Sequence, residues 1–416
     1  MEFEEKKESL FSFNNPTSFQ YLWIGLSTSI LGNHLSRIAL IWYVNENFIG
    51  ATGATALSIS NTLPIAIVAI FAGVLADRYN KKILLYIGDL MQTFLMLMLF
   101  ITFTSISPSI LHISIFSAIS GIFSVLYSPV SQTIISDLSK NNQKKAIQMN
   151  SWMLSTNSIL GTIGPAIAGI LVTVLPINMI ILINALTFFV SFLSTFLMGK
   201  ASEREGISLK VPNIKRNNFF LEAKQGLNYV FTHPVLSPLF ITFAFLDATT
   251  HALTYLLPQI LKDSLDVNAS VYGAALAVGM VSRVLSIYIF NKTSFVKKRG
   301  IVFCFNLLIQ GLGVLCISLA DSVIWIFIGY ILLGIPSGMV MVCLSSYIQI
   351  DHPQEIRGRI FSTLQATTTI AKPIWIIAIA FLSSYIGVQN TFMFSAVILL
   401  ISGIYICSRR IIRTIN

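Results

Sequence analysis

Apolar residues gather in twelve runs along the 416-residue chain, with short polar stretches between them. The runs lie near 19–44, 56–76, 83–103, 110–135, 153–175, 177–198, 235–257, 271–290, 301–320, 323–347, 361–386 and 390–408. A bilayer core about 30 Å thick needs about 20 apolar residues in each spanning helix. Backbone groups in lipid must pair within helices or a closed barrel, and the alternating pattern typical of barrel strands does not occur. The pattern therefore predicts an all-α integral membrane protein with twelve transmembrane helices.

Composition agrees with this pattern, because 55% of the residues are hydrophobic and only 11% are charged, too few to cover a water-soluble surface. The opening segment "MEFEEKKESLFSFNNPTS" is polar, and no small-residue cleavage pattern follows the first run. We therefore expect the first span to be retained. The four cysteines all fall within predicted spans, where we expect them to pack as small residues, without a disulfide or a metal site.

The basic residues indicate the orientation, since Lys and Arg in short loops stay on the cytoplasmic side. With the N-terminus inside, all but four of the 27 basic residues lie in cytoplasmic segments. Lys262 lies in an outer loop, and Arg37, Arg283 and Lys372 lie within spans. We therefore predict a multi-pass protein of the cell (plasma) membrane, bacterial, with both termini cytoplasmic. The net charge of +10 is then a signal of topology rather than of nucleic-acid binding.

The longest polar stretch divides the chain into two halves of six spans. Within it, "FFLEAKQGLNYVFTHP" has the amphipathic spacing of a helix on the membrane surface. The segments "SDLSKNNQKKAIQ" and "IDHPQEIRGRIFS" follow spans four and ten, about 213 residues apart, which indicates a repeat and two pseudo-symmetric bundles. The predicted parts are a tail (1–18), an N-terminal bundle (19–198), a cytoplasmic central loop with the surface helix (199–234), a C-terminal bundle (235–408) and a tail (409–416).

The loop "GVLADRYNKK" between spans two and three resembles the signature loop of the major facilitator superfamily. The matching positions are Gly73, Asp77, Arg78, Lys81 and Lys82. The resemblance implies that Asp77 faces the N-terminal end of span eleven, where a helix dipole favours an anion. It also implies that Arg78 pairs with Asp137 in a latch that closes the cytoplasmic side, while the lysines anchor the loop. An ordinary positive-inside loop would account for the lysines alone.

Span five carries a second resemblance, in "GTIGPAIAG". Gly161, Gly164, Pro165 and Gly169 match the Gly-Pro motif associated with antiporters of this superfamily, whereas generic small-residue packing would also use these residues. The segments "YLWIG", "IALIWYV", "YSPVSQTIISDL", "QGLNYVFTHPVL" and "RGRIFSTLQA" are similar to the macrolide-efflux-like, drug:proton antiporter branch. The second-half counterpart of the latch, "NKTSFVKKRG", keeps only basic residues.

Energy coupling is expected to use an ion gradient, because the chain has no phosphate-cradling Gly-rich loop and needs no cofactor. Asp247, midway along span seven, is the best candidate to carry the coupled proton, with Arg37 or Arg283 near it. His251 lies one turn later, and His34 lies 213 positions earlier, so both are candidates for a proton relay or for packing. Asp89 lies only about two turns from the cytoplasmic end of span three, and the resemblance implies a structural role.

The substrate cavity is expected to contain Arg37, Arg283 and Lys372. Three cations against one carboxylate favour neutral or anionic amphipathic molecules. The sequence thus predicts a monomeric exporter of a small amphipathic molecule (a drug, macrolide-like compound or secondary metabolite) that works by alternating access with proton antiport, surrounded by membrane lipids. A lipid or lysophospholipid flippase of the same fold is the alternative. A non-transporting receptor or an enzyme is remote, because no catalytic spacing or metal-ligand cluster occurs.

Overall fold

A computed structural model describes residues 16–48, 51–78, 80–125, 127–140, 142–207, 219–292 and 299–410. These residues form fourteen α-helices and no strand. The helices are α1 (Ser18–Asn47), α2 (Ala51–Arg78), α3 (Lys81–Ser105), α4 (Ile110–Ser124), α5 (Tyr127–Leu138), α6 (Gln143–Val174), α7 (Ile177–Arg204), α8 (Phe219–Thr232), α9 (Leu236–Asp263), α10 (Ala269–Asn291), α11 (Arg299–Ser318), α12 (Val323–Asp351), α13 (Gln354–Ile386) and α14 (Val388–Ser408). The all-α prediction is confirmed.

Eleven stretches within the described ranges are long and apolar enough to cross a membrane. One of them, Ile110–Leu138, consists of α4 and α5 together. The twelfth expected span is α1, whose 30 residues would reach about 45 Å. It is less apolar than the others because it carries polar residues such as His34 and Arg37, which line the cavity described below.

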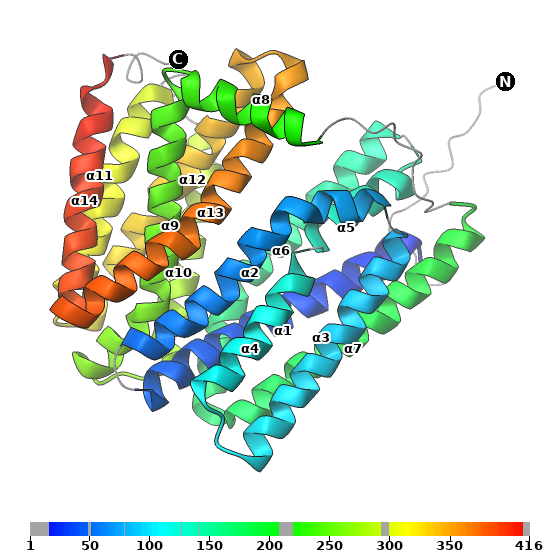
Figure 1. Ribbon diagram of the computed structural model, residues 1–416, viewed down its shortest axis with the longest axis horizontal. Helices are drawn as coiled ribbons and strands as arrows, with labels where there is room; N and C mark the ends of the chain where they lie inside the picture. Colours follow the sequence, from blue (N-terminus) through cyan, green and yellow to red (C-terminus); the bar gives the residue numbers. More distant parts are fainter. Residues whose placement is uncertain are drawn as a thin grey trace.

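The helices form two groups, α1–α7 and α8–α14 (Figure 1). Within the first group α1 and α3 pack on α7, and within the second α11 packs on α12 and α14. Between the groups, α6 packs on α10 and α2 packs on α13. We call the end that carries α8 and the α2–α3 connection the basic end, and the opposite end, where α13 joins α14, the short-loop end.

Span four is interrupted between α4 and α5, and Pro129 explains the position of the break. Proline lacks a backbone N–H, and its ring clashes with the carbonyl group four residues earlier, here Val125. α4 accordingly ends at Ser124, and Pro129 lies in the first turn of α5, where a backbone N–H has no helical partner anyway. The sequence signal for this break, "YSPV", begins at Tyr127.

α8 lies at the basic end and packs against α13 (Figure 1). A Cβ on Gly226 would lie 2.9 Å from Thr363 Oγ1 and 3.2 Å from Arg359 O, so the two helices approach closely. Arg359 Nη1 also donates a hydrogen bond to Gln225 Oε1 at 3.0 Å. The segment expected to form a surface helix is therefore helical, and its role as a tether between bundles stays a prediction.

Candidate functional site

A central cavity lies between the two groups of helices and has two adjoining chambers. The aromatic chamber, about 350 Å³, includes on its wall Phe243, Tyr255, Tyr272 and Tyr330. The hydroxyl chamber, about 330 Å³, includes on its wall Ser36, Asn61, Thr62, Ser117, Ser120 and Thr369. Arg37, His251 and Tyr255 line both chambers and so mark their junction. One cavity thus offers an apolar wall to one part of a molecule and hydrogen-bonding groups to another.

The charged residues expected in the membrane interior all reach this cavity. Arg37, Arg283 and Asp247 line the aromatic chamber, and Lys372 lines the hydroxyl chamber. Lys372 Nζ on α13 lies 3.0 Å from Asp247 Oδ2 on α9, so these two residues form an ion pair. Sequence reasoning expected Arg37 or Arg283 to be the cation near Asp247 and missed this pairing. The side chains of Asp247 and Lys372 are 39% and 28% exposed, so a molecule in the cavity can reach the pair.

The two candidate relay histidines also line the aromatic chamber with Asp247. Arg37 Nη2 lies 3.4 Å from His34 Nδ1 on the same helix. His251 Nε2 is buried and has no hydrogen-bond partner among the described residues. Whether either histidine relays protons stays a prediction.

The glycines of the Gly-Pro motif place α6 in backbone contact with α10 of the other group. A Cβ on Gly273 would lie 2.3 Å from Pro165 O and 2.9 Å from Gly169 Cα. Gly161 and Pro165 line the aromatic chamber, and a Cβ on Gly164 would lie 2.9 Å from His34 Cβ. The motif therefore lets α6 close the cavity toward the short-loop end and also shapes its wall.

A second contact closes the same end. Asn45 Nδ2 on α1 donates a hydrogen bond to Tyr255 O on α9 at 3.0 Å, across the two groups. At the basic end, by contrast, the described ion pairs Lys81–Asp137, Lys82–Glu203 and Arg299–Asp351 each stay within one group. In the part of the chain whose side chains are described, these close contacts between α6 and α10 and between α1 and α9 lie at the short-loop end.

A third cavity, of about 330 Å³, lies within the first group toward the basic end, and we call it the vestibule. Its polar wall consists of Ser29, Asn33, Ser124, Tyr127, Ser131, Gln132, Asn150 and Asn157. Asn33 and Ser124 also line the hydroxyl chamber. The vestibule therefore continues the polar surface from the basic end toward the Lys372–Asp247 pair.

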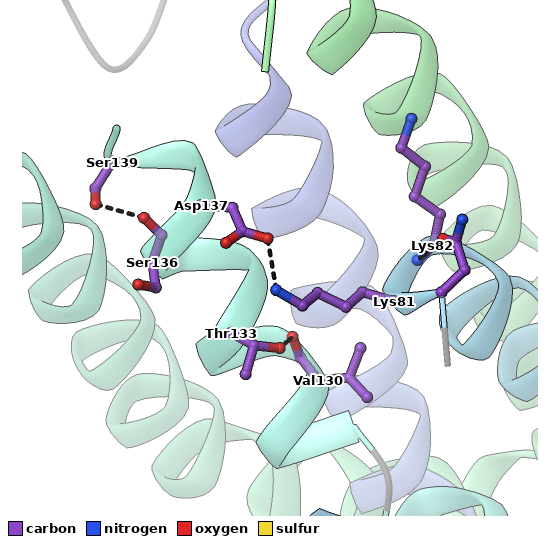
Figure 2. Close-up of polar contacts among 8 residues, drawn as sticks. Lys81, Lys82, Val130, Thr133, Ser136, Asp137 and Ser139 are labelled. Carbon is purple, nitrogen blue, oxygen red and sulfur yellow. Dashed lines mark hydrogen bonds and ion pairs between the residues drawn. The ribbon is translucent and has the colours of Figure 1, made fainter. Parts of the chain in front are cut away.

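The gating loop forms an ion pair that sequence reasoning assigned differently. Figure 2 shows Lys81 reaching from α3 to Asp137 on α5, with a distance of 2.7 Å between Lys81 Nζ and Asp137 Oδ2. Lys81 is only 2% exposed, so it does more than anchor the loop at the membrane surface. Lys82 Nζ lies 3.0 Å from Glu203 Oε1 on α7. The side chains of Gly73, Asp77 and Arg78 lie outside the described residues, so their expected contacts stay predictions.

The second half contains a matching pair. Arg299, at the start of α11, lies 2.8 Å from Asp351 Oδ2 at the end of α12. Lys81 and Asp137 occupy the corresponding helix ends in the first half. Sequence analysis expects only basic residues in this counterpart and does not assign Asp351 as their acidic partner. The repeat of "SDLS" and "IDHP" was the signal that could have located it.

Comparisons with known proteins agree on the class of molecule. The family model for the Major Facilitator Superfamily matches residues 22–374. The chain is 25% identical to the staphyloferrin A transporter of Staphylococcus aureus, over 87% of this chain and 88% of that protein. It is 23% identical to macrolide efflux protein A of Streptococcus pyogenes, over 93% and 95%. A crystal structure of a POT family transporter in complex with 5-aminolevulinic acid superposes with a TM-score of 0.73 at 15% identity, over 94% and 95%.

Proposed function

Because the chain belongs to the Major Facilitator Superfamily and is therefore a membrane transporter rather than an enzyme, we propose that it exports a small amphipathic molecule by proton antiport. The observation that carries the proposal is the Asp247–Lys372 ion pair in a cavity that also contains Arg37 and Arg283. An ionisable residue in the membrane interior is costly and is retained for binding or for moving charge. Asp247 is the carboxylate placed to exchange a proton there.

Similar proteins support export. One relative is named for macrolide efflux, another for transport of staphyloferrin A, and a third, 22% identical, is multidrug resistance protein MdtG of Klebsiella pneumoniae. We place the chain in the cell membrane of a bacterium, as a monomer among lipids, with the basic end and both termini in the cytoplasm. The cavity, closed toward the short-loop end, then faces the side from which an exporter loads.

The charge of the cavity sets the class of substrate. Asp247 and Lys372 neutralise each other, and Arg37 and Arg283 have no acidic partner among the described side chains. A neutral or anionic molecule is therefore favoured over a cation. Its apolar part fits the aromatic chamber, and its donor and acceptor groups fit the hydroxyl chamber.

Antiport requires that the proton and the substrate exclude each other. Deprotonated Asp247 can accept hydrogen bonds from substrate hydroxyl or amine groups at both carboxylate oxygens, whereas protonated Asp247 turns one of those oxygens into a donor. Protonation removes the negative charge, converts one acceptor oxygen into a donor, and weakens the pair with Lys372, which links α9 to α13. The molecule can thus carry substrate outward with Asp247 charged and return with Asp247 protonated. Deprotonated Asp247 thus favours bound substrate, and protonated Asp247 favours the state without substrate.

The test compares wild type with Asp247→Asn in reconstituted vesicles, using a radiolabelled macrolide and staphyloferrin A as probes. We expect wild type to move a probe uphill when a proton gradient is applied, and Asp247→Asn to bind the same probe at every pH without uphill transport. Uphill transport by Asp247→Asn would place the proton site elsewhere, with His34 and His251 next. Stronger probe binding on acidification would contradict antiport, because proton and probe would then bind together.

The same vesicles separate the exporter from the flippase. An exporter should not move a fluorescent lysolipid between leaflets. Gradient-independent movement of that lipid would instead support the flippase and overturn the proposal.

A further inference from the structure

A second carboxylate is buried in the first group of helices, away from the cavity. Asp89 on α3 is 0% exposed, and no Lys, Arg or His among the described side chains pairs with it. The hydroxyl of Tyr127, at the start of α5, donates a hydrogen bond to Asp89 Oδ1 at 2.5 Å. Thr195 Oγ1 on α7 lies 3.1 Å from Asp89 Oδ2. A carboxylate held only by hydroxyl groups differs from the latch residue Asp137, which has a lysine.

The described side chains around Asp89 supply no compensating charge. Ser191, one turn before Thr195 on α7, adds another buried hydroxyl. On α3 itself, Gln92 pairs with Ser120 of α4 and is neutral. The nearest lysine along α3, Lys82, lies two turns away and pairs with Glu203. Burial of a charge without a partner is costly, so a proton on Asp89 relieves a penalty that no protein cation offsets.

Hydroxyl partners suit both protonation states, because a hydroxyl can donate or accept a hydrogen bond. The charged form of Asp89 accepts from Tyr127 at Oδ1 and from Thr195 at Oδ2. In the neutral form Oδ1–H donates to Tyr127 Oη, while Thr195 still donates to Oδ2. No heavy atom has to move between these two states. A lysine partner, such as Lys81 beside Asp137, by contrast stabilises only the charged form of a carboxyl group.

Tyr127 connects this carboxylate to the vestibule. It lines the vestibule wall and begins α5 at the break in span four. A Cβ on Gly88 would lie 3.4 Å from Tyr127 Oη, so the absence of a side chain there gives the hydroxyl room beside Asp89. Interrupted helices in membrane proteins are places where ions bind, because their ends carry polar groups at membrane depth. Tyr127 therefore lies at the break in span four, lines the vestibule and hydrogen-bonds to the buried Asp89.

We propose that Asp89 and Tyr127 form a second proton-binding site, distinct from Asp247, that exchanges protons with the vestibule. A hydronium ion in the vestibule gives a proton to Tyr127 Oη while the tyrosine passes its own hydrogen to Asp89 Oδ1, and the reverse transfer releases the proton. One proton is gained or lost, and both residues keep their positions. This proposal rests on the proposed function in one respect only, which is that a proton gradient drives transport.

The proposed site lies on α5, the helix that also carries Asp137 of the latch. This helix is tied to α3 at its start by Tyr127–Asp89 and at its end by Asp137–Lys81. The first tie changes its donor and acceptor when a proton binds, whereas the second does not. The proposed proton site and the latch thus lie at the two ends of one short helix.

The experiment counts protons on the purified chain without any transported ligand. A pH-indicator dye follows proton uptake when the protein is brought from about pH 8 to about pH 5. We expect Asp89→Asn to take up one proton fewer per chain than wild type, because the amide keeps the hydrogen bonds but cannot titrate. Thr93→Val is the matched control: Thr93 is one turn away and bonds only to the carbonyl oxygen of Asp89.

Three further outcomes decide the proposal. Equal uptake by Asp89→Asn and wild type would overturn it, since Asp89 would then keep one protonation state throughout this pH range. If Asp89→Asn does not fold, Tyr127→Phe replaces it: we expect uptake of the same proton slowed by at least about tenfold in stopped-flow mixing, and an unchanged rate overturns the relay. Normal uphill transport by Asp247→Asn would refute the proposed role of Asp247 in proton antiport. The number of protons taken up at Asp89 would be unaffected by that result.

Discussion

The contact between α6 and α10 makes a prediction about the conformational equilibrium that can be worked from distances. In Gly273→Ala, the new Cβ would lie 2.3 Å from Pro165 O, 2.9 Å from Gly169 Cα and 3.0 Å from Gly169 N. All three atoms belong to the α6 backbone, so no side-chain rotation relieves the overlap. The two helices must separate by about 1 Å before carbon and oxygen reach a normal contact of about 3.5 Å.

Overpacking of this kind costs about 1–3 kcal/mol. The cost applies to the conformation described here, in which α6 and α10 touch near the short-loop end. Alternating access requires a second conformation in which this contact opens, and there the added methyl group has no such neighbour. The substitution should therefore shift the equilibrium about 5- to 150-fold toward the conformation that is open at the short-loop end.

The assay is a distance distribution between spin labels on two exposed residues of the short-loop end, Ser107 in the first group and Asp321 in the second. The four native cysteines are replaced first, so that only the labels react. We expect the longer distance to gain population in Gly273→Ala. Gly358→Ala is the matched control, because a Cβ on Gly358 would have no neighbour within 4 Å. An unchanged distribution in a folded Gly273→Ala protein would refute the closure argument.

Three other predictions concern the latch, the topology and pH. Asp77→Asn should insert normally yet transport poorly, because the latch loses its charge–dipole contact; normal efflux at equal expression would remove the latch from the mechanism. In intact cells a membrane-impermeant thiol reagent should label Asn47→Cys and not Arg204→Cys, both exposed positions at opposite ends, and labelling of the latter would reverse the orientation. Burial and then the charge of nearby His352 lower the pKa of His233 below its ordinary value of 6.5. The folded state therefore disfavours the protonated ring, so the thermal midpoint should fall as pH drops through about 6.5. His233→Asn, which can still accept the backbone N–H groups of 235 and 236, should weaken that dependence; an equal pH dependence in both proteins would show that other groups cause it.

The sequence predicts the charged residues of the cavity without any knowledge of its geometry. Arg37, Arg283, Lys372 and Asp247 were identified as interior charges because charge within an apolar run is rare. Their shared location in one cavity follows from a fold in which inward faces of many spans meet. Their pairing did not follow, because Asp247 and Lys372 lie on helices far apart in the chain and meet only through the packing of α9 on α13.

For the latch and for Asp89, too, the sequence identifies the residues and the structure identifies their partners. The sequence identified a charged loop and placed Asp137 at the end of span four, but a residue's partner depends on the rotation of its helix. Lys81 rather than a neighbouring residue turns toward Asp137 in the part of the chain that the structure describes. For Asp89 the family resemblance implies a structural role, and nothing in its own helix marks Tyr127, on the far side of a break, as its partner.

The sequence by itself determined the class, the spans and the direction of the charge asymmetry, because the thickness of a bilayer, helix periodicity and loop charge are local properties read residue by residue. Tertiary structure decided which charges pair, where the chambers join and which end is closed. Those features depend on how helices rotate and cross, and small residues such as Gly169 and Gly273 set that by allowing two backbones to touch.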